Sequence, residues 1–402
     1  MRQGVALANV RGLTITEAAV ETHVMRPAHV EGVISSRGLE DGEGPADIAF
    51  AAAVPHHFDV DGFGEALHMA LKNAVAGCVM RLSQNGQTIA TLQSDWARRP
   101  VDGPEGWTPG VRMHIAGCST LITAIAMTKL LNDKRMSYDT PIIDYLPRSW
   151  SKGPNADRIT FRHLMTHTSG LNEPGSASDY RFMKANIAKG VTGVGTYHYQ
   201  NQNFGLCRIL IATLNGNVSP AQTFALPLVP DANDRFWDYT TIRAYGAYVR
   251  TRVFAPAGVP GPTMDHRSSD ALAYTFPVNR SSWNSGDLST MIGAVGWHMS
   301  ADELRSVMSA FRRGGTIMSP SQAQTVLDSG FGIDGTASTP LGTLYYKSGV
   351  WGNGHGHQEQ SLAYFLPQDG ELVVLVNSPM GSPASCLRNV VTNLYISHVK
   401  AG

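Results

Sequence analysis

One stretch decides the expected fold: Met113-His-Ile-Ala-Gly-Cys-Ser-Thr120-Leu-Ile-Thr-Ala-Ile-Ala-Met-Thr-Lys-Leu-Leu131. From Leu121 onward the apolar residues recur at three- and four-residue spacing, which predicts a buried helix that begins near Gly117. The first turn of a helix has free N–H groups and the positive end of the helix dipole, and both favour developing negative charge. The start of this helix is therefore a candidate position for a reactive group.

Composition narrows the class of protein. The chain has 402 residues, 43% of them hydrophobic, enough for a large core built as two interleaved lobes. Lys plus Arg and Asp plus Glu both number 32, so the formal charge is zero and no global field recruits nucleic acid or an anionic membrane. We expect a small-molecule partner, and the oligomeric state stays open.

The cysteines and the apolar segments indicate the cellular compartment in which the protein is expected. No CxxC pair occurs among the cysteines, which argues against a zinc knuckle or a redox motif and favours reduced thiols. The N-terminal apolar run is too short for a signal peptide, and no run approaches the roughly 18 apolar residues of a membrane span. We therefore expect a cytoplasmic protein without a cofactor. The cysteines are Cys78, Cys118, Cys207 and Cys386.

Strand patterns gather near both ends of the chain. Two strand-like runs, 75–83 and 88–93, flank Asn85-Gly86, which is a strong hairpin signal. Further strands are expected over 343–347, 361–366 and 371–377, and helices over 62–74, 161–170, 204–214, 241–253, 304–311 and 384–399.

This distribution predicts an α+β architecture with a cleft between two lobes. An irregular, mainly helical part separates the two groups of strands. The expected divisions are an N-terminal extension over 1–58, a sheet lobe over 59–120 and 291–402, and a mainly helical lobe over 121–290.

Four linked motifs carry a family resemblance. They are Met136-Ser-Tyr-Asp-Thr-Pro-Ile-Ile-Asp-Tyr-Leu-Pro147, Arg162-His-Leu-Met-Thr-His-Thr-Ser-Gly-Leu171, Tyr199-Gln-Asn201 and Lys347-Ser-Gly349. Together they resemble the serine β-lactamase and penicillin-binding-protein-like superfamily, in particular its class C-like esterase and D-aminopeptidase branch, over roughly residues 60 to 400. The resemblance implies a β-lactamase-like fold, with an antiparallel sheet flanked by helices and an inserted, mainly helical lobe.

The chain departs from this family at the opening stretch. Family members resemble F-x-I-G-S-x-S-K-x-x-T-A, in which the first Ser attacks a carbonyl and the Lys one helical turn later accepts its proton. Aligned with this pattern, Gly117 occupies the nucleophile position and Thr120 the lysine position. An acyl-enzyme needs a nucleophile and a nearby base, so the resemblance implies that the usual Ser/Lys acylation pair is missing.

Three other groups could supply reactivity in place of the Ser/Lys pair. Ser119 lies about 200° around the helix from Gly117 and has no basic residue one turn on. The thiol of Cys118 could act as a nucleophile, but no basic residue is evident beside it. A small buried residue is therefore the better interpretation of Cys118. If the fold holds, Tyr199 and Lys347 meet at the cleft, where an ammonium would favour phenolate and make Tyr199 a general acid or base.

Each candidate site residue also has a plain structural interpretation. Tyr199 could be a wall of the pocket, and Asn201 a brace of its loop instead of a substrate hydrogen-bond donor. Lys347 is better suited to recognising an anion or carbonyl than to moving protons, and Gly349 could present backbone N–H groups. The expected substrate-binding residues are Gly117, Cys118, Thr120, Asn201, Ser348, Gly349 and Trp351, beside the catalytic candidates Tyr199 and Lys347.

The histidines do not predict a metal site. His355 and His357 form an HxH pair, but Glu359 is the only further candidate ligand at short spacing, which is weak support for a metal site. His163 and His167 have the spacing of a zinc pair without the glutamate of HExxH, and the resemblance makes them structural. His114 could reach the emptied site, although a core or surface histidine is the better interpretation.

The leading functional hypothesis is a repurposed enzyme. It would act on a small carbonyl- or carboxylate-bearing compound by non-covalent acid/base chemistry through Tyr199 and Lys347. The rival hypothesis is a pseudoenzyme that binds a ligand without turnover. A third is an ordinary esterase, peptidase or acyltransferase of the family in which Gly117 and Thr120 were engineered to inactivate it.

Overall fold

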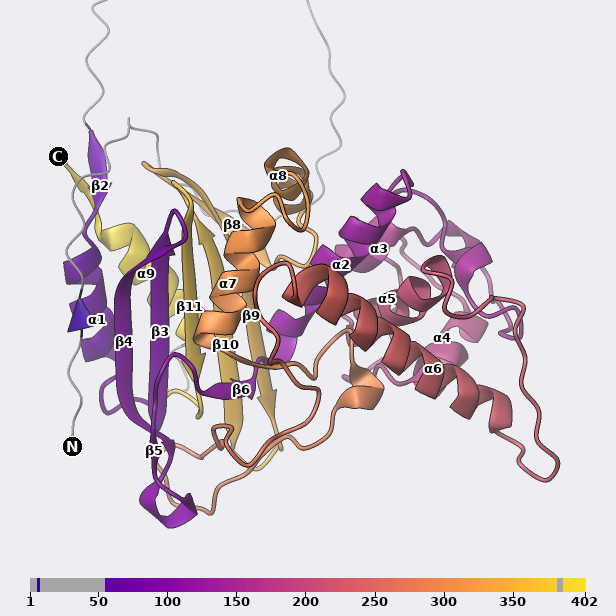
Figure 1. The fold of residues 1–402 in the computed structure, drawn as a ribbon, viewed down its shortest axis with the longest axis horizontal. Helices are drawn as coiled ribbons and strands as arrows, with labels where there is room; N and C mark the ends of the chain where they lie inside the picture. Colours follow the sequence, from indigo (N-terminus) through magenta and orange to yellow (C-terminus); the bar gives the residue numbers. More distant parts are fainter. Residues whose placement is uncertain (1–5, 8–54, 382–385) are drawn as a thin grey trace, which may run out of the picture.

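The computed structural model describes residues 6–7, 55–381 and 386–402. A large sheet occupies one side of the molecule and a group of helices the other (Figure 1). Most of the expected extension over 1–58 lies outside the described residues. Its described parts are strand β1 (Ala6–Leu7), which pairs with β4, and strand β2 (His56–Phe58), which pairs with β12 (Val399–Ala401).

The main sheet is built from both ends of the chain, as the strand patterns predicted. Its order is β1-β4-β3-β11-β10-β9-β8, and every neighbouring pair is antiparallel. The pairing of β3 with β11 places Met80 opposite Val374 and joins the early strands to the late ones. The strands are β3 (Gly77–Gln84), β4 (Gln87–Arg98), β8 (Gly335–Thr339), β9 (Gly342–Gly352), β10 (Gln358–Leu366) and β11 (Gly370–Val376), with β5 (Glu105–Gly106) added beside β4.

The hairpin between β3 and β4 confirms the turn predicted at Asn85-Gly86. Both residues have positive φ angles, 52° and 76°, which is the conformation that a two-residue turn of right-twisted strands requires. Asparagine and glycine adopt it at low cost. The turn therefore fixes where the sheet begins.

Helices cover both faces of the sheet (Figure 1). Successive residues of a strand point to opposite faces, so Val373 packs in one hydrophobic cluster with Phe311 and Val374 in the other with Phe63. Because β11 is buried on both faces, its residues 372–376 are a continuous apolar run. The covering helices are α1 (Val60–Leu71) and α9 (Leu387–Ser397) on one face and α7 (Ala301–Arg312) on the other, with α8 (Pro320–Asp328) packed against α7.

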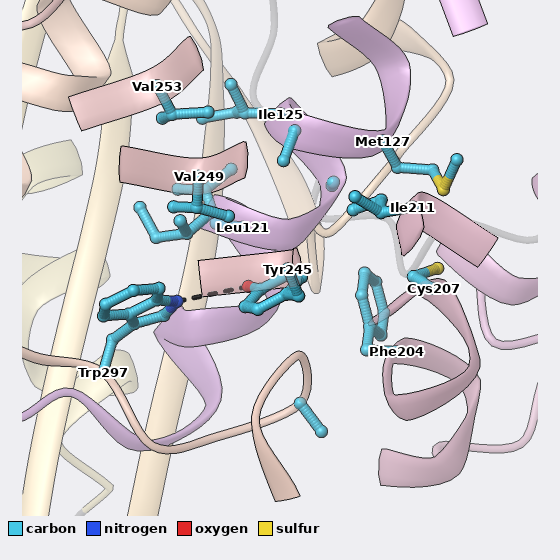
Figure 2. Packing of buried hydrophobic residues seen from close by; sticks show 14 of the residues in the cluster. Leu121, Ile125, Met127, Phe204, Cys207, Ile211, Tyr245, Val249, Val253 and Trp297 are labelled. Carbon is cyan, nitrogen blue, oxygen red and sulfur yellow. Dashed lines mark hydrogen bonds between the residues drawn. The ribbon is translucent and has the colours of Figure 1, made fainter. Parts of the chain in front are cut away.

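Helix α2 (Ser119–Asp133) is the centre of the helical part and confirms the predicted buried helix. A short 3-10 turn, Ala116–Cys118, leads into it. Figure 2 shows α2 packed among side chains of neighbouring segments, including Phe204, Tyr245 and Trp297. The other helices are α3 (Phe161–Met165), α4 (Tyr180–Lys189), α5 (Asn201–Leu214) and α6 (Ala232–Val249), which continues into a π-helical turn over Arg250–Phe254.

The structure corrects several predicted boundaries. Helix α6 is much longer than the short stretch expected over 241–253, and α4, α8 and strand β8 were not predicted. Helix α3 begins where the helix expected over 161–170 should begin, capped by Thr160, but it ends already at Met165. The caps at Thr160 and Ser300 both form complete capping boxes.

The segment that leads from α6 back to the sheet runs along the sheet's end. Leu272 N donates to Ala97 O and Tyr274 N donates to Asn377 O, so this part of the expected helical lobe lies against sheet strands. Strand β7 (His298–Ser300) then pairs with β6 (Arg112–His114) just before α2. Among the described residues, no helix is long and apolar enough to cross a membrane.

Candidate active site

A cavity of about 760 Å³ lies where the turn before α2, strand β9 and the loop before α5 meet. Seven of the nine predicted site residues line it: Gly117, Tyr199, Asn201, Lys347, Ser348, Gly349 and Trp351. Sequence reasoning did not identify the other lining residues, which are Ser176, Tyr197, Val295, Asp334, Tyr346, Val350, Gly352 and Arg388.

Gly117 lies against strand β9 and the phenol of Tyr199. A Cβ atom added to Gly117 would be 3.0 Å from Ser348 O, 3.3 Å from the Cα of Gly349 and 3.4 Å from Tyr199 Oη. A Cβ added to Gly349 would be only 2.5 Å from Gly117 N. The two glycines therefore allow a close approach of two backbone segments, and the space a side chain at position 117 would enter faces Tyr199.

Cys118 and Thr120 do not line the cavity, although both were expected to bind substrate. The thiol of Cys118 is fully buried with its Sγ 3.6 Å from Lys347 O, and burial raises the pKa of the thiol to about 12. Thr120 is also buried, and its hydroxyl donates to Gly117 O at 2.9 Å. Both side chains are buried outside the cavity lining, and the hydroxyl of Thr120 lies against Gly117 O. Cys118 takes the small buried role left open above.

Ser119 is equally removed from the cavity. Its side chain is fully buried, and its Oγ accepts the backbone N–H of Trp297 at 3.3 Å. This agrees with its expected direction, away from Gly117 around the helix. None of the three residues that follow Gly117 therefore offers a nucleophile to the cavity.

Asp334 pairs with Lys347, and no sequence motif marked it. Lys347 Nζ lies 2.5 Å from Asp334 Oδ1, while the backbone N–H and the hydroxyl of Ser348 donate to Oδ2 at 2.8 and 2.7 Å. Asp334 immediately precedes β8, and its N–H donates to Tyr346 O, so the β8–β9 hairpin brings it to Lys347.

The two charges of this pair stabilise each other. Burial alone lowers the pKa of Lys347, but the Asp334 carboxylate raises it above its ordinary value. Burial alone raises the pKa of Asp334, but the Lys347 ammonium and the two Ser348 donors hold it below its ordinary value. Lys347 is therefore a cation at neutral pH and no proton acceptor.

Tyr199 lies between Lys347 and His167. Lys347 Nζ is 5.1 Å from the centre of the Tyr199 ring, a cation–π distance, and the centre of the His167 ring is 4.3 Å away with its plane tilted by 34°. Tyr199 is 42% exposed, so its ring is supported from the protein side and open to the cavity. This is the position expected of a group that meets a ligand.

His167 supports the loop that carries Tyr199. Its Nδ1 accepts the backbone N–H of Gln200 at 3.2 Å, and the side-chain nitrogen of Asn203 lies 3.1 Å from the same atom. Burial, followed by the nearby charge of Lys347, lowers the pKa of His167 to about 3. A neutral imidazole is what these donors require, and His167 has the structural role that the resemblance implied.

Asn201 braces its loop. Its side-chain nitrogen donates to Ser176 O at 2.8 Å, and the residue is 6% exposed. The structure therefore supports the bracing interpretation more directly than the substrate hydrogen bond, although Asn201 does border the cavity.

Arg388 adds a positive charge to the cavity wall. It reaches the cavity from α9, and its guanidinium carbon lies 5.5 Å from the centre of the Tyr346 ring. Within the described part of the chain, no carboxylate forms an ion pair with it. Since Asp334 balances Lys347, Arg388 leaves the lining with a net positive charge that suits an anionic group.

The HxH histidines are engaged in local hydrogen bonds. His357 Nε2 lies 2.7 Å from Ser281 O and its Nδ1 lies 3.0 Å from the Asn353 side chain, while His355 is exposed. His114 is a core residue: its Nδ1 lies 3.0 Å from Glu359 Oε2 and its Nε2 accepts the N–H of Gly296. It therefore does not enter the cavity.

Comparison with known proteins assigns the class. Residues 60–226 match the Beta-lactamase family model. The Bacillus subtilis protein PbpX, provisionally named as a penicillin-binding protein, is 22% identical over 206 residues, which are 49% of this chain and 45% of that protein. The chain thus spans about half the length of this curated relative.

Solved structures of similar fold agree. A class C β-lactamase from Rhodobacter sphaeroides is 17% identical with a TM-score of 0.60, over 84% of this chain and 99% of that one. A D-amino acid amidase from Ochrobactrum anthropi, complexed with L-phenylalanine, is 18% identical with a TM-score of 0.61, over 84% and 97%. An octameric penicillin-binding protein homologue from Pyrococcus abyssi is 16% identical with a TM-score of 0.62, over 84% and 76%.

These comparisons support the serine β-lactamase and penicillin-binding-protein-like superfamily: residues 60–226 match its Beta-lactamase model, and the described chain has the β-lactamase-like α+β fold. The family model carries this assignment, and the low-identity structures show the fold alone. The resemblance read from the four motifs is confirmed at this level.

Proposed function

We propose that this protein binds a small carbonyl- or carboxylate-bearing compound in the cavity and transforms it by non-covalent acid/base chemistry. Tyr199 is the proton donor and acceptor, and Lys347 is the cation beside it. The observation that carries the proposal is the geometry at Gly117, where a side chain would face Tyr199 Oη at 3.4 Å but glycine provides none. A ligand atom can occupy that space.

The lining offers no well-activated nucleophile among the described residues. Ser348 is the one predicted site residue with a hydroxyl in the cavity wall that also contacts a carboxylate, because its Oγ donates to Asp334 Oδ2 at 2.7 Å. The pKa of that carboxylate is held low by Lys347, and a weakly basic carboxylate removes a serine proton poorly. Covalent acylation therefore has little support here.

Tyr199 has the surroundings of an acid/base group. In the proposed step its phenol donates a proton to a substrate oxygen or nitrogen, and the resulting phenolate recovers a proton from solvent. The ammonium of Lys347 lies 5.1 Å from the ring centre and places a positive charge beside the group that transfers the proton. The exposure of Tyr199 to the cavity gives both substrate and solvent access.

The cavity suits a small ligand with an anionic end. Its volume of about 760 Å³ falls in the usual range for small-molecule sites, roughly 300–1,000 Å³. Tyr197, Tyr346 and Trp351 supply aromatic walls, and Arg388 supplies the positive charge that Asp334 does not balance. A carboxylate at the Arg388 end would leave the rest of the ligand beside Tyr199.

A second candidate function is binding without turnover. The Lys347–Asp334 pair favours it, because the carboxylate offsets much of the electrostatic help that the ammonium gives Tyr199. A pseudoenzyme would keep the same lining residues and need no proton transfer.

The first experiment tests for acylation. The purified protein is incubated with a fluorophosphonate and with benzylpenicillin, and its intact mass is measured. We expect no adduct. A stoichiometric adduct on Ser119, Cys118 or Ser348 would overturn the proposal.

The second experiment separates turnover from binding. The protein is screened against p-nitrophenyl acetate, D-phenylalanine amide and small keto acids, with product formation and thermal shift as readouts. For any compound turned over, Tyr199→Phe should reduce kcat about 100-fold or more, while Tyr197→Phe, the matched control in the same wall, should change it little. Unchanged kcat in Tyr199→Phe would rule out the acid/base role, and thermal shifts without product would favour the pseudoenzyme.

A further inference from the structure

Three side chains outside the cavity form a second site. His266, Asp270 and His298 each place a possible ligand atom within 4.8 Å of the other two. We propose that they bind a divalent transition metal ion, with Zn²⁺ the best match to the donors. This proposal does not depend on the function proposed for the cavity.

His298 is oriented as a ligand. It lies on β7, opposite His114 of β6, and is fully buried. Its Nδ1 lies 3.3 Å from Gly296 O, so Nδ1 carries the proton and Nε2 has the free lone pair. Among the described residues Nε2 has no hydrogen-bond partner. Metal-bound histidines commonly donate their other N–H to a backbone carbonyl in this way.

His266 offers a second unpartnered nitrogen. Its Nδ1 is buried and has no hydrogen-bond partner in the described chain. Its ring centre lies 6.2 Å from that of His298, at a steep angle. The nearby bridge of Thr263 with His298 holds this segment beside β7. A buried imidazole nitrogen without a partner is costly, and each of these two neighbouring rings has one.

Asp270 completes the set with a carboxylate. It is 1% exposed, and its Oδ2 accepts the backbone N–H of Arg267 at 2.9 Å, which fixes the orientation of the group. The N–H of Ala271 donates to Arg112 O and ties this turn to β6, the partner of the strand that carries His298. The three ligands thus come from segments that the backbone holds together.

The neighbouring charged residues leave the site to these three ligands. Both ring nitrogens of His114 are already in contact with Glu359 and Gly296. The cations near these ligands are Arg112, Arg267 and Arg98. Glu303 pairs with Arg112 through contacts of 2.7 to 3.1 Å, and Arg98 donates to Asp102 O. Asp270 also borders a cavity of about 520 Å³.

The donor set selects the kind of metal. Two imidazole nitrogens and one carboxylate oxygen match Zn²⁺ and similar ions, and three protein ligands leave a fourth tetrahedral position for water. Mg²⁺ and Ca²⁺ prefer all-oxygen sites. The His298 ring also contacts His114, which contacts Trp351 of the cavity wall, so a bound ion would brace that wall.

The test measures metal binding directly. The full-length protein is treated with a chelator, dialysed and titrated with Zn²⁺ by calorimetry, and separately with Co²⁺ by visible absorption. We expect one ion per chain, a Co²⁺ spectrum of a four-coordinate nitrogen and oxygen site, and a raised Tm with metal.

Variants locate the ion. His266→Ala and Asp270→Asn should each weaken Zn²⁺ affinity at least about tenfold and remove the Co²⁺ spectrum, with folding checked by circular dichroism in the absence of metal. His355→Ala, an exposed histidine of the HxH pair, is the matched control and should bind as the wild type does. Wild-type protein that binds no ion, or binds it equally in His266→Ala and Asp270→Asn, would overturn the proposal and leave buried water as the partner of the two imidazoles.

Discussion

Lys347 and Asp334 form a buried ion pair at the edge of the cavity, with Nζ 2.5 Å from Oδ1, and the same carboxylate accepts both donors of Ser348. The lysine of the Lys-Ser-Gly segment is thus held by its own sheet through the β8–β9 hairpin. It can supply a fixed positive charge to a ligand, but it is not free to collect protons.

Replacing Asp334 should be costly. Asp334→Asn leaves the Lys347 charge buried without a partner, which typically costs about 3–5 kcal/mol of the free energy of unfolding. Urea unfolding measures the change. The matched control is Asp139→Asn, which removes an exposed pair with Arg162 and should cost less than about 1 kcal/mol. Equal decreases of the free energy of unfolding in the two variants would show that the buried Lys347–Asp334 pair contributes no more to stability than an exposed pair.

The contact between Gly117 and Gly349 should tolerate no side chain at position 349. The Cβ of Gly349→Ala would lie 2.5 Å from Gly117 N and 2.8 Å from Ile115 O, both backbone atoms. The strand must therefore move, at a cost of about 1–3 kcal/mol or more. Gly106→Ala, whose Cβ would meet nothing within 4 Å, should be nearly neutral in the same thermal or urea unfolding measurement.

Stability should fall in acid partly through His167. The pKa of His167 is about 3 in the folded protein against an ordinary value of 6.5, because burial and then the charge of Lys347 lower it, opposed by Asp334. The unfolded chain thus binds a proton between these values while the folded chain does not, so the free energy of unfolding decreases as pH falls from 6.5 toward 3. The contribution of one proton is about 1.4 kcal/mol per pH unit.

The variant His167→Asn removes the titrating imidazole and so isolates its contribution to the pH dependence of the free energy of unfolding. Asparagine is chosen because it tolerates the positive φ of 56° found at this position. Urea unfolding between about pH 4.5 and 6.5 should show a shallower pH dependence in the variant than in the wild type. Identical slopes would mean that His167 titrates in the folded protein as it does in the unfolded chain.

Restoring the family pattern should create reactivity. The double variant Gly117→Ser with Thr120→Lys supplies a nucleophile and a base, and a fluorophosphonate should then add once per chain at position 117, as read by intact mass. The new Cβ lies 3.0 Å from Ser348 O, a tight contact that a small shift relieves. Gly117→Ala with Thr120→Lys is the control and should not react. If the fluorophosphonate also labelled this control, the reactive group would be a residue other than the one at position 117.

The sequence predicted the elements that have a local signature. Asn85-Gly86 defines its turn by its own φ preferences, Ser300 and Thr160 define helix starts by their caps, and strands β9 to β11 show in their apolar pattern. The first half of helix α6, before residue 241, was missed because polar and apolar residues mix along it without a clear period, so tertiary packing and not periodicity holds it in place.

The same division applies to the site. Tyr199, Lys347 and Gly349 were found because each belongs to a contiguous motif. Asp334 and Arg388 were missed because their relation to the cavity is purely tertiary: a hairpin delivers the first and a C-terminal helix the second. Cys118 and Thr120 were misplaced because a helical start tells which residues are close to a site, but not which of them point into it.

The pairing of β3 with β11 has a consequence for synthesis of the protein. Residues 77–84 must remain without their partner until residues 370–376 have been translated, and β9, which carries Lys347, is attached to them only through β10 and β11. On the ribosome the helices around α2 can gather early from local contacts. The cavity is then assembled last, so a nascent chain has no complete cavity until residues 370–376 have emerged.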